Sequence, residues 1–185
     1  MHKYDAFFDS LTAQALALGA NRAAVIPAKA VPVNADFRKL CESNQCGMYG
    51  KCWTCPPDIG DVDLLIAQLR TYQNALVYQQ VSPLEDSFDL EGMQMAKKTH
   101  RQLAQQLQEV FDRSTVKDCL HLGAGGCGIC PVCTRTEGKP CRFPDRAIVS
   151  LEAYGVDVSQ LAKAAGMNYV NGPNTVTYFG MVLFS

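Results

Sequence analysis

The sequence predicts an α/β fold, in which a mixed or partly parallel sheet is flanked by helices and carries cysteine-rich loops. Apolar segments of strand length alternate along the chain with segments of helical periodicity. Hydrophobic residues make up 48% of the 185 residues, which is enough for a full-sized core. Because no internal repeat or low-complexity linker divides the sequence, we expect a single domain over residues 1–185, with two cysteine-rich loops at 41–60 and 123–144.

The helices are predicted from apolar side chains at helical spacing and from the residues that end each segment. They cover residues 4–18, 35–40, 62–70, 88–111 and 158–165. Asp61 is placed to cap the helix that begins at Val62, and Gly19 and Gly166 are placed to end the helices before them. The longest segment carries His100 on its apolar stripe, where a buried, hydrogen-bonded histidine is expected more often than a metal ligand.

The strands are predicted from short apolar runs bounded by turn residues. They cover residues 23–27, 75–81, 116–122 and 175–184. The strand that ends at Leu122 leads into a glycine-rich loop, which we expect at the carboxyl end of a strand, where open α/β sheets place their sites. In the same strand Cys119 is predicted to be a small core residue, and Cys119 and His121 are predicted to face opposite sides of the sheet.

The amino-acid composition argues against several classes of function. The 17 basic and 18 acidic residues nearly cancel, which argues against binding to nucleic acid or to an anionic membrane surface. No apolar run reaches the roughly 18 residues of a membrane-spanning helix, and the first residues lack the pattern of a secretory signal. We therefore expect a cytoplasmic protein. Thiols are kept reduced in the cytoplasm, so its nine cysteines suggest metal or redox chemistry.

The second cysteine group has the denser pattern. It begins as Cys127-Gly-Ile-Cys130-Pro-Val-Cys133, a run with the first three spacings of the bacterial ferredoxin motif. Closely spaced thiolates suit the separate iron corners of a cluster, whereas a single zinc is more often held by two separated C-x2-C pairs. Cys141 follows at a longer gap and after Pro140, which leaves open whether it completes the same cluster. The preferred interpretation is a [4Fe–4S] cluster, ahead of zinc and of metal-free redox thiols.

Glycines and basic residues surround this group. The glycines leave the backbone free to fold close to a cluster and to turn N–H groups toward its sulfurs. The basic residues are Arg135, Lys139, Arg142 and Arg146. They are expected either to offset the negative charge of a cluster or to form a solvated surface, and the sequence favours neither reading.

The first cysteine group consists of Cys41, Cys46, Cys52 and Cys55. Its gaps are irregular, so its metal-ligand signal is weaker. The segment Cys52-Trp-Thr-Cys55 invites comparison with a redox C-x-x-C motif, whose thiolate is stabilised by a helix N-terminus. Pro56 and Pro57 disfavour such a helix, which favours metal ligands over a dithiol. Cys52 alone has a further reading, in which it packs under Trp53.

Both groups resemble one known family. The segments Cys41…Cys46-Gly-Met-Tyr-Gly-Lys-Cys-Trp-Thr-Cys55-Pro-Pro and Gly-Ala-Gly-Gly-Cys127…Cys130…Cys133…Pro-Cys141-Arg-Phe-Pro are similar to the predicted metal-binding proteins called domain of unknown function 2284. Residues 150–158 and 174–180 extend the likeness over most of the chain. The resemblance implies bound metal, with Cys52 as a local addition and the other seven cysteines of the two groups on the family's cysteine positions. It implies no settled reaction.

The sequence therefore leaves three hypotheses. The first is a [4Fe–4S] protein, with one or two clusters, in electron transfer or small-molecule redox chemistry with a redox partner protein or a small molecule. The second is a zinc-stabilised, non-catalytic binding or regulatory module. The third is a cluster enzyme with one iron open to substrate, which needs only three cysteines at one site. Whether the chain is an enzyme, and its oligomeric state, stay open.

Overall fold

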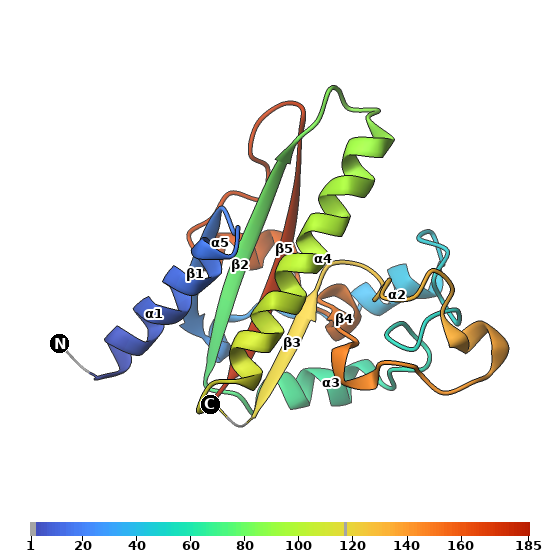
Figure 1. The fold of residues 1–185 in the computed structure, drawn as a ribbon. Helices are drawn as coiled ribbons and strands as arrows, with labels where there is room; N and C mark the ends of the chain where they lie inside the picture. The colour runs from blue at the N-terminus through green and yellow to red at the C-terminus, as the bar shows by residue number, and fades with distance from the viewer. Residues whose placement is uncertain (1–2, 117) are drawn as a thin grey trace.

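A five-stranded mixed sheet lies at the centre of the computed structural model, which describes residues 3–116 and 118–185 (Figure 1). The strands are β1 (Arg22–Pro27), β2 (Asn74–Pro83), β3 (Cys119–Gly123), β4 (Val149–Ser150) and β5 (Thr175–Phe184). Their order is β1-β2-β5-β3-β4, and β3 and β4 are parallel while the other neighbours are antiparallel. The predicted α/β fold with a mixed sheet is confirmed.

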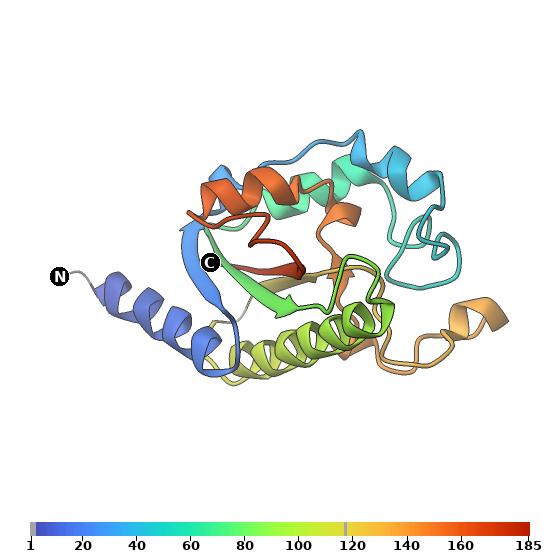
Figure 2. The same ribbon diagram turned by 90° about the horizontal axis from the view of Figure 1, so that it is seen from above.

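Helices cover both faces of the sheet. They are α1 (Lys3–Ala17), α2 (Phe37–Glu42), α3 (Val62–Leu69), α4 (Leu90–Asp112) and α5 (Val158–Ala164). Seen from above, α1 and α4 lie on one face, and α2, α3 and α5 lie on the other (Figure 2). The Asp61 side chain caps α3 as predicted, because it accepts hydrogen bonds from the backbone N–H groups of Asp63 and Leu64. The helix predicted from residue 88 begins at Leu90 because Asp89 caps it.

The two central strands are buried on both sides. Leu76 and Tyr78 of β2 pack under α1 and α4, whereas Ala75 and Val77 pack toward α3 and α5. A strand that is covered on both faces has a nearly continuous apolar sequence, which is why β2 and β5 could both be predicted from the sequence. β4 was not predicted, because two residues carry no periodicity. Lys117, at the start of the predicted strand 116–122, lies outside the described residues.

The predicted orientation of Cys119 and His121 is wrong. Residues two positions apart on a strand share a face, and both side chains lie on the α4 side of β3. Cys119 is half-buried against the core there, in agreement with its predicted packing role. His121 is buried and shares hydrogen bonds with the Tyr78 hydroxyl, at 2.9 Å, and with Oε1 of Gln108, at 3.1 Å.

His100 is buried between aromatic rings. Its ring stacks on Tyr78 and lies 5.6 Å from the ring centre of Tyr178, centroid to centroid. The expected hydrogen bonds are missing: within the described structure neither ring nitrogen has a partner, and the backbone of Phe179 approaches the ring without reaching hydrogen-bond geometry. Burial, with a smaller contribution from the charge of Arg101, lowers the pKa of His100 to about 4. Burial likewise lowers the pKa of His121 to about 3.

These histidines predict a loss of stability in acid. Each is neutral in the fold but binds a proton in the unfolded chain below about pH 6.5, so the free energy of unfolding falls as the pH drops from 6.5 toward 4. We expect His100→Phe to remove one such contribution. Between pH 7 and pH 4.5 the wild type should lose about 2–3 kcal/mol more than the variant, in anaerobic urea unfolding at matched metal content. Equal losses in the two proteins would contradict a neutral, buried His100.

Candidate metal centre

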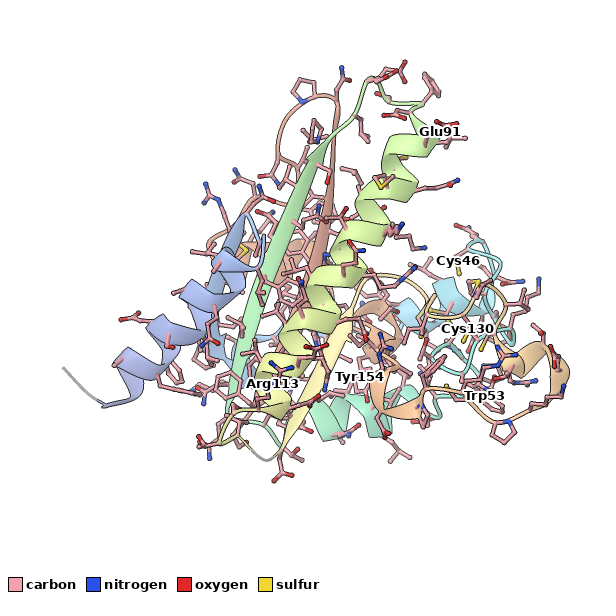
Figure 3. All side chains as sticks on the ribbon, in the orientation of Figure 1. Cys46, Trp53, Glu91, Arg113, Cys130 and Tyr154 are labelled. Carbon is pink, nitrogen blue, oxygen red and sulfur yellow. The ribbon has the colours of Figure 1, made fainter. Side chains whose placement is uncertain are left out.

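The two cysteine loops lie side by side beyond the carboxyl end of β3 (Figures 1 and 3). The indole N–H of Trp53 donates to the carbonyl of Lys139 at 3.0 Å, across 86 residues of sequence. The backbone N–H of Cys127 donates to the Thr54 hydroxyl oxygen at 3.2 Å. Figure 3 places Cys46 and Cys130 in the same irregular lobe. Cysteine groups that lie far apart in sequence are thus neighbours in the fold.

The first loop contains no helix after its last cysteine. Residues 43–61 form a series of turns, and the backbone N–H of Gly50 closes the loop by donating to the Pro56 carbonyl at 2.8 Å. Gly50 has a φ of 66°, in the left-handed region that glycine adopts most readily. The expectation that Pro56 and Pro57 prevent a helix is confirmed. No helix N-terminus is therefore available to stabilise a Cys52 thiolate.

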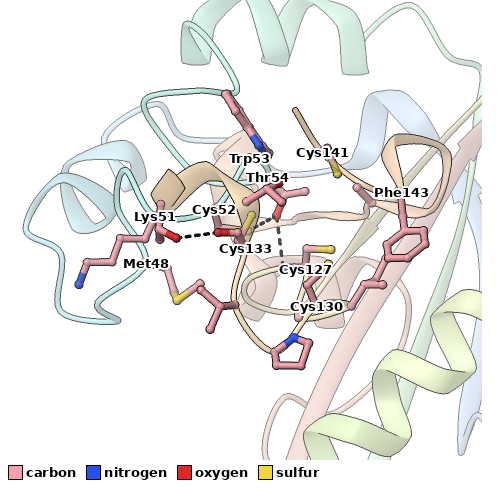
Figure 4. A pocket seen from close by; sticks show the side chains of 17 residues that line it. Met48, Lys51, Cys52, Trp53, Thr54, Cys127, Cys130, Cys133, Cys141 and Phe143 are labelled. Atoms are coloured by element: carbon pink, nitrogen blue, oxygen red, sulfur yellow. Dashed lines mark hydrogen bonds between the residues drawn. The ribbon is translucent and has the colours of Figure 1, made fainter. Parts of the chain in front are cut away.

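All four cysteines of the second group line one cavity of about 260 Å³ (Figure 4). Cys141 shares it with Cys127, Cys130 and Cys133 despite the longer gap in sequence. The remaining wall is mainly apolar, and includes Met48, Ile129, Pro131, Val132 and Phe143. Cys52, from the first group, is a fifth thiol in this wall. The structure thus places Cys141 at the same cavity as the other three cysteines.

The other cysteines of the first group line a second cavity of about 660 Å³. These are Cys41, Cys46 and Cys55, whereas Cys52 lines the first cavity. Over residues 3–116 and 118–185, no three Cys, His, Asp or Glu side chains are drawn together tightly enough to hold one ion. Metal binding therefore requires the thiols to close around the metal, which couples site formation to folding.

Cys52 and Cys55 form the wall between the two cavities. The Cys52 sulfur lies 3.3 Å from the hydroxyl oxygen of Thr54. Hydrogen bonds from the Cys55 thiol and then from Thr54 lower the pKa of Cys52 against the effect of its burial. The same thiol–thiol bond, together with burial, raises the pKa of Cys55. Burial also raises the pKa of Cys127, so metal binding at these thiols releases protons.

Two of the four predicted basic neighbours are already neutralised by carboxylates. Nε of Arg135 lies 2.8 Å from the carboxylate oxygens of Asp58, and its guanidinium carbon lies 5.3 Å from the ring centre of Trp53. Lys139 pairs with Glu137 at 2.7 Å. The Arg135 contacts link the two loops, whereas the Lys139–Glu137 pair lies within the second. The charges of Arg135 and Lys139 are therefore poor candidates for offsetting the charge of a metal centre.

Arg101 on α4 places an unpaired positive charge next to the second group. Its Nη1 donates to the Gly128 carbonyl at 2.9 Å, and a Cβ at Gly128 would collide with the guanidinium. The Arg101 charge lowers the pKa of Cys127, although burial outweighs it. Arg142 and Arg146 bond neutral groups, the Val132 carbonyl and the Gln105 amide oxygen. Within the described chain no carboxylate lies within ion-pair distance of these three arginines.

Thiolates are soft donors that select zinc, copper(I) and iron–sulfur clusters, so this donor set fits a metal. A family model described as "Predicted metal-binding protein (DUF2284)" matches residues 24–184. The chain belongs to this family. The DUF2284 match includes both cysteine loops and supports metal binding, without fixing which metal is bound. Searches of curated proteins and of solved structures found no match. No helix in the described part of the chain is long and apolar enough to span a membrane.

Proposed function

We propose that this DUF2284 protein carries a [4Fe–4S] cluster on its second cysteine group and uses it in electron transfer or small-molecule redox chemistry. The observation that supports the proposal is the shared cavity, in which four thiols from a single loop face one space. Four cysteine thiolates are the usual ligand set of such a cluster. In the glycine-rich start of the loop, Gly128 lines this cavity, which brings the backbone close to the thiols and lets N–H groups face a cluster.

The size and lining of the cavity favour a cluster over a single zinc ion. Zinc holds four sulfurs at about 2.3 Å and leaves little space between them. The cavity here is about 260 Å³, whereas one water molecule needs roughly 10–15 Å³ on a comparable measure. Its wall is mainly apolar, and the surroundings of a cluster are one of the means by which proteins set its reduction potential.

The unpaired arginines suit electron exchange at the surface. Arg101, Arg142 and Arg146 surround the loop and carry positive charge that no carboxylate of the described chain offsets. A reduced cluster gains negative charge, so a neighbouring cation stabilises the reduced form. The same positive rim would steer an acidic redox partner toward the cluster.

Arg101→Gln is expected to lower the reduction potential of this cluster. Removing one partly screened charge near the cluster costs the reduced form about 1 kcal/mol, or roughly 50 mV for one electron. Arg113→Gln is the matched control, because Arg113 lies at the far end of α4 and pairs with Glu109 (Figure 3). Spectroelectrochemical titration of both variants would measure the shift. Equal potentials in wild type and Arg101→Gln would exclude this role for Arg101.

The test of the proposed function is the colour and paramagnetism of protein purified without oxygen. A [4Fe–4S] protein should be brown, with broad absorption at the blue end of the visible spectrum that bleaches on reduction. The reduced protein should give a cluster signal in electron paramagnetic resonance. Colourless protein that contains zinc and gives no such signal would instead support a zinc-stabilised, non-catalytic module.

A further inference from the structure

The second cavity has the size of a small-molecule binding site. Its volume of about 660 Å³ lies within the roughly 300–1,000 Å³ of ligand pockets. Three thiols line it, from Cys41 near the end of α2 and from Cys46 and Cys55 in the first loop. Cys55 and Gly126 line this cavity, whereas Cys52 and Cys127 line the cluster cavity. The Cys52–Cys55 pair and the Gly126–Cys127 backbone therefore lie between the two. It is therefore a site distinct from that of the proposed cluster.

The three thiols line one cavity and differ in exposure. Cys46 is exposed, Cys41 is half-buried and Cys55 is buried. Three thiolates can hold a [4Fe–4S] core with one iron lacking a protein sulfur. An unfilled position of this kind is how catalytic metal sites admit a ligand.

A buried arginine beside these thiols points to a missing negative charge. Arg38 is only 8% exposed, and arginine stays protonated in proteins. Its Nη2 donates to the Ala153 carbonyl at 3.3 Å, while its buried Nε has no partner and, in the described residues, no carboxylate lies within ion-pair distance. An unpaired buried charge is strongly unfavourable. Arg38 lies three residues before Cys41 on α2, so a thiolate-bound metal centre there would supply the anion.

Two further polar groups, Lys97 and Glu152, line the pocket. The Lys97 ammonium lies over Gly125, 3.3 Å from where a Cβ would stand, and no carboxylate of the described chain pairs with it. Burial raises the pKa of Glu152, and hydrogen bonds to its own backbone and to Ser150 oppose that rise. The third charged group, Asp157, is already engaged, because its carboxylate accepts from the backbone N–H of Gln160 at 3.0 Å. A ligand with a carboxylate for Lys97 and a hydroxyl for Glu152 would contact both groups.

Resting on the iron–sulfur function proposed above, we propose that Cys41, Cys46 and Cys55 hold a second [4Fe–4S] cluster whose fourth iron is open and binds a small hydroxy acid in this pocket. The carboxylate or hydroxyl oxygen of the ligand fills the open position. Lys97 pairs with the carboxylate of the ligand. Arg38, three residues before Cys41 on α2, offsets the negative charge of the cluster. Only ligand exchange at iron is involved, with no net electron transfer.

The test uses dithionite-reduced protein, electron paramagnetic resonance, and two probes, cyanide and lactate. We expect each probe to change the signal of one cluster and to leave the other unchanged, while lactamide, the neutral counterpart of lactate, has little effect. Cys46→Ala should lose about half of the iron together with the probe-sensitive signal. Because Cys46 is exposed, this variant should still fold. Lys97→Met should weaken lactate binding roughly tenfold and leave cyanide binding unchanged, with the adjacent Lys98→Met as control.

The outcomes separate the two proposals. The open site would be contradicted if neither cluster responded to cyanide or lactate. It would also be contradicted if the responding signal persisted in Cys46→Ala. A single cluster that is unaffected by Cys46→Ala would overturn the second site and leave the proposed function standing. Protein that contains no iron would contradict both the proposed function and the open site. Binding of lactate and lactamide with equal affinity would overturn the assignment of a carboxylate ligand.

Discussion

Cys130→Ser and Cys133→Ser are each expected to lose most of the iron bound at the second cysteine group. Both thiols line the cluster cavity, and each supplies one corner of the proposed cluster. Site formation is coupled to folding, so each variant should also lose more than about 3 kcal/mol of its free energy of unfolding. Iron analysis and anaerobic denaturant unfolding, on protein purified under identical conditions, measure the two effects.

Cys119→Ala is the matched control for these variants. Cys119 packs half-buried against the core on the α4 side of the sheet and lines neither cysteine cavity. Its replacement should leave the metal content unchanged and cost only about 1 kcal/mol through lost packing. If Cys119→Ala lost as much iron as Cys130→Ser, Cys119 would be a ligand and its assignment to the core would be wrong.

The second large effect separates the cysteines of the first group. Cys46→Ala and Cys55→Ala should lose the metal of the first centre and retain that of the second. Cys52→Ala should keep the metal of both centres, because hydrogen bonds to Thr54 and Cys55 hold Cys52 in the wall between the two cavities. Since Cys52 is buried, this variant should nevertheless lose about 1–3 kcal/mol of stability. Iron per chain and the cluster spectrum of each variant provide the measurement.

The same variants also test whether there are two centres or one. The two cavities share the Cys52–Cys55 wall, so a single site that draws ligands from both loops is the alternative. In that case Cys46→Ala would lose all of its metal while remaining folded. Retention of about half of the iron is the result that two separate centres predict.

Much of the fold could be predicted from local sequence signals. β5 was predicted with its observed bounds, and Asp61 was identified as a helix cap, because periodicity and capping depend on residues near in sequence. The start of the longest helix was placed two residues early, since Asp89 was not recognised as its cap. Cys119 and His121 were assigned to opposite faces, although a strand's two-residue period puts them on one.

The candidate site was predicted in part. Spacing identified eight cysteines, but it could not show that Cys52 lines the cavity of the second group, because that depends on contacts such as Trp53 with Lys139, 86 residues apart. Arg101 was missed for the same reason, because only the packing of α4 brings its charge to Cys127. Arg38 lies three residues before Cys41 on α2, and it was missed because its burial depends on contacts distant in sequence, such as that with Ala153.

The most direct measurement of the central claim is metal and sulfide analysis of protein that has never been exposed to air. Two [4Fe–4S] clusters predict iron and acid-labile sulfide in near-equal amounts, about eight of each per chain, and one cluster predicts about four. Stoichiometric zinc without sulfide, in protein prepared in this way, would contradict the iron–sulfur account.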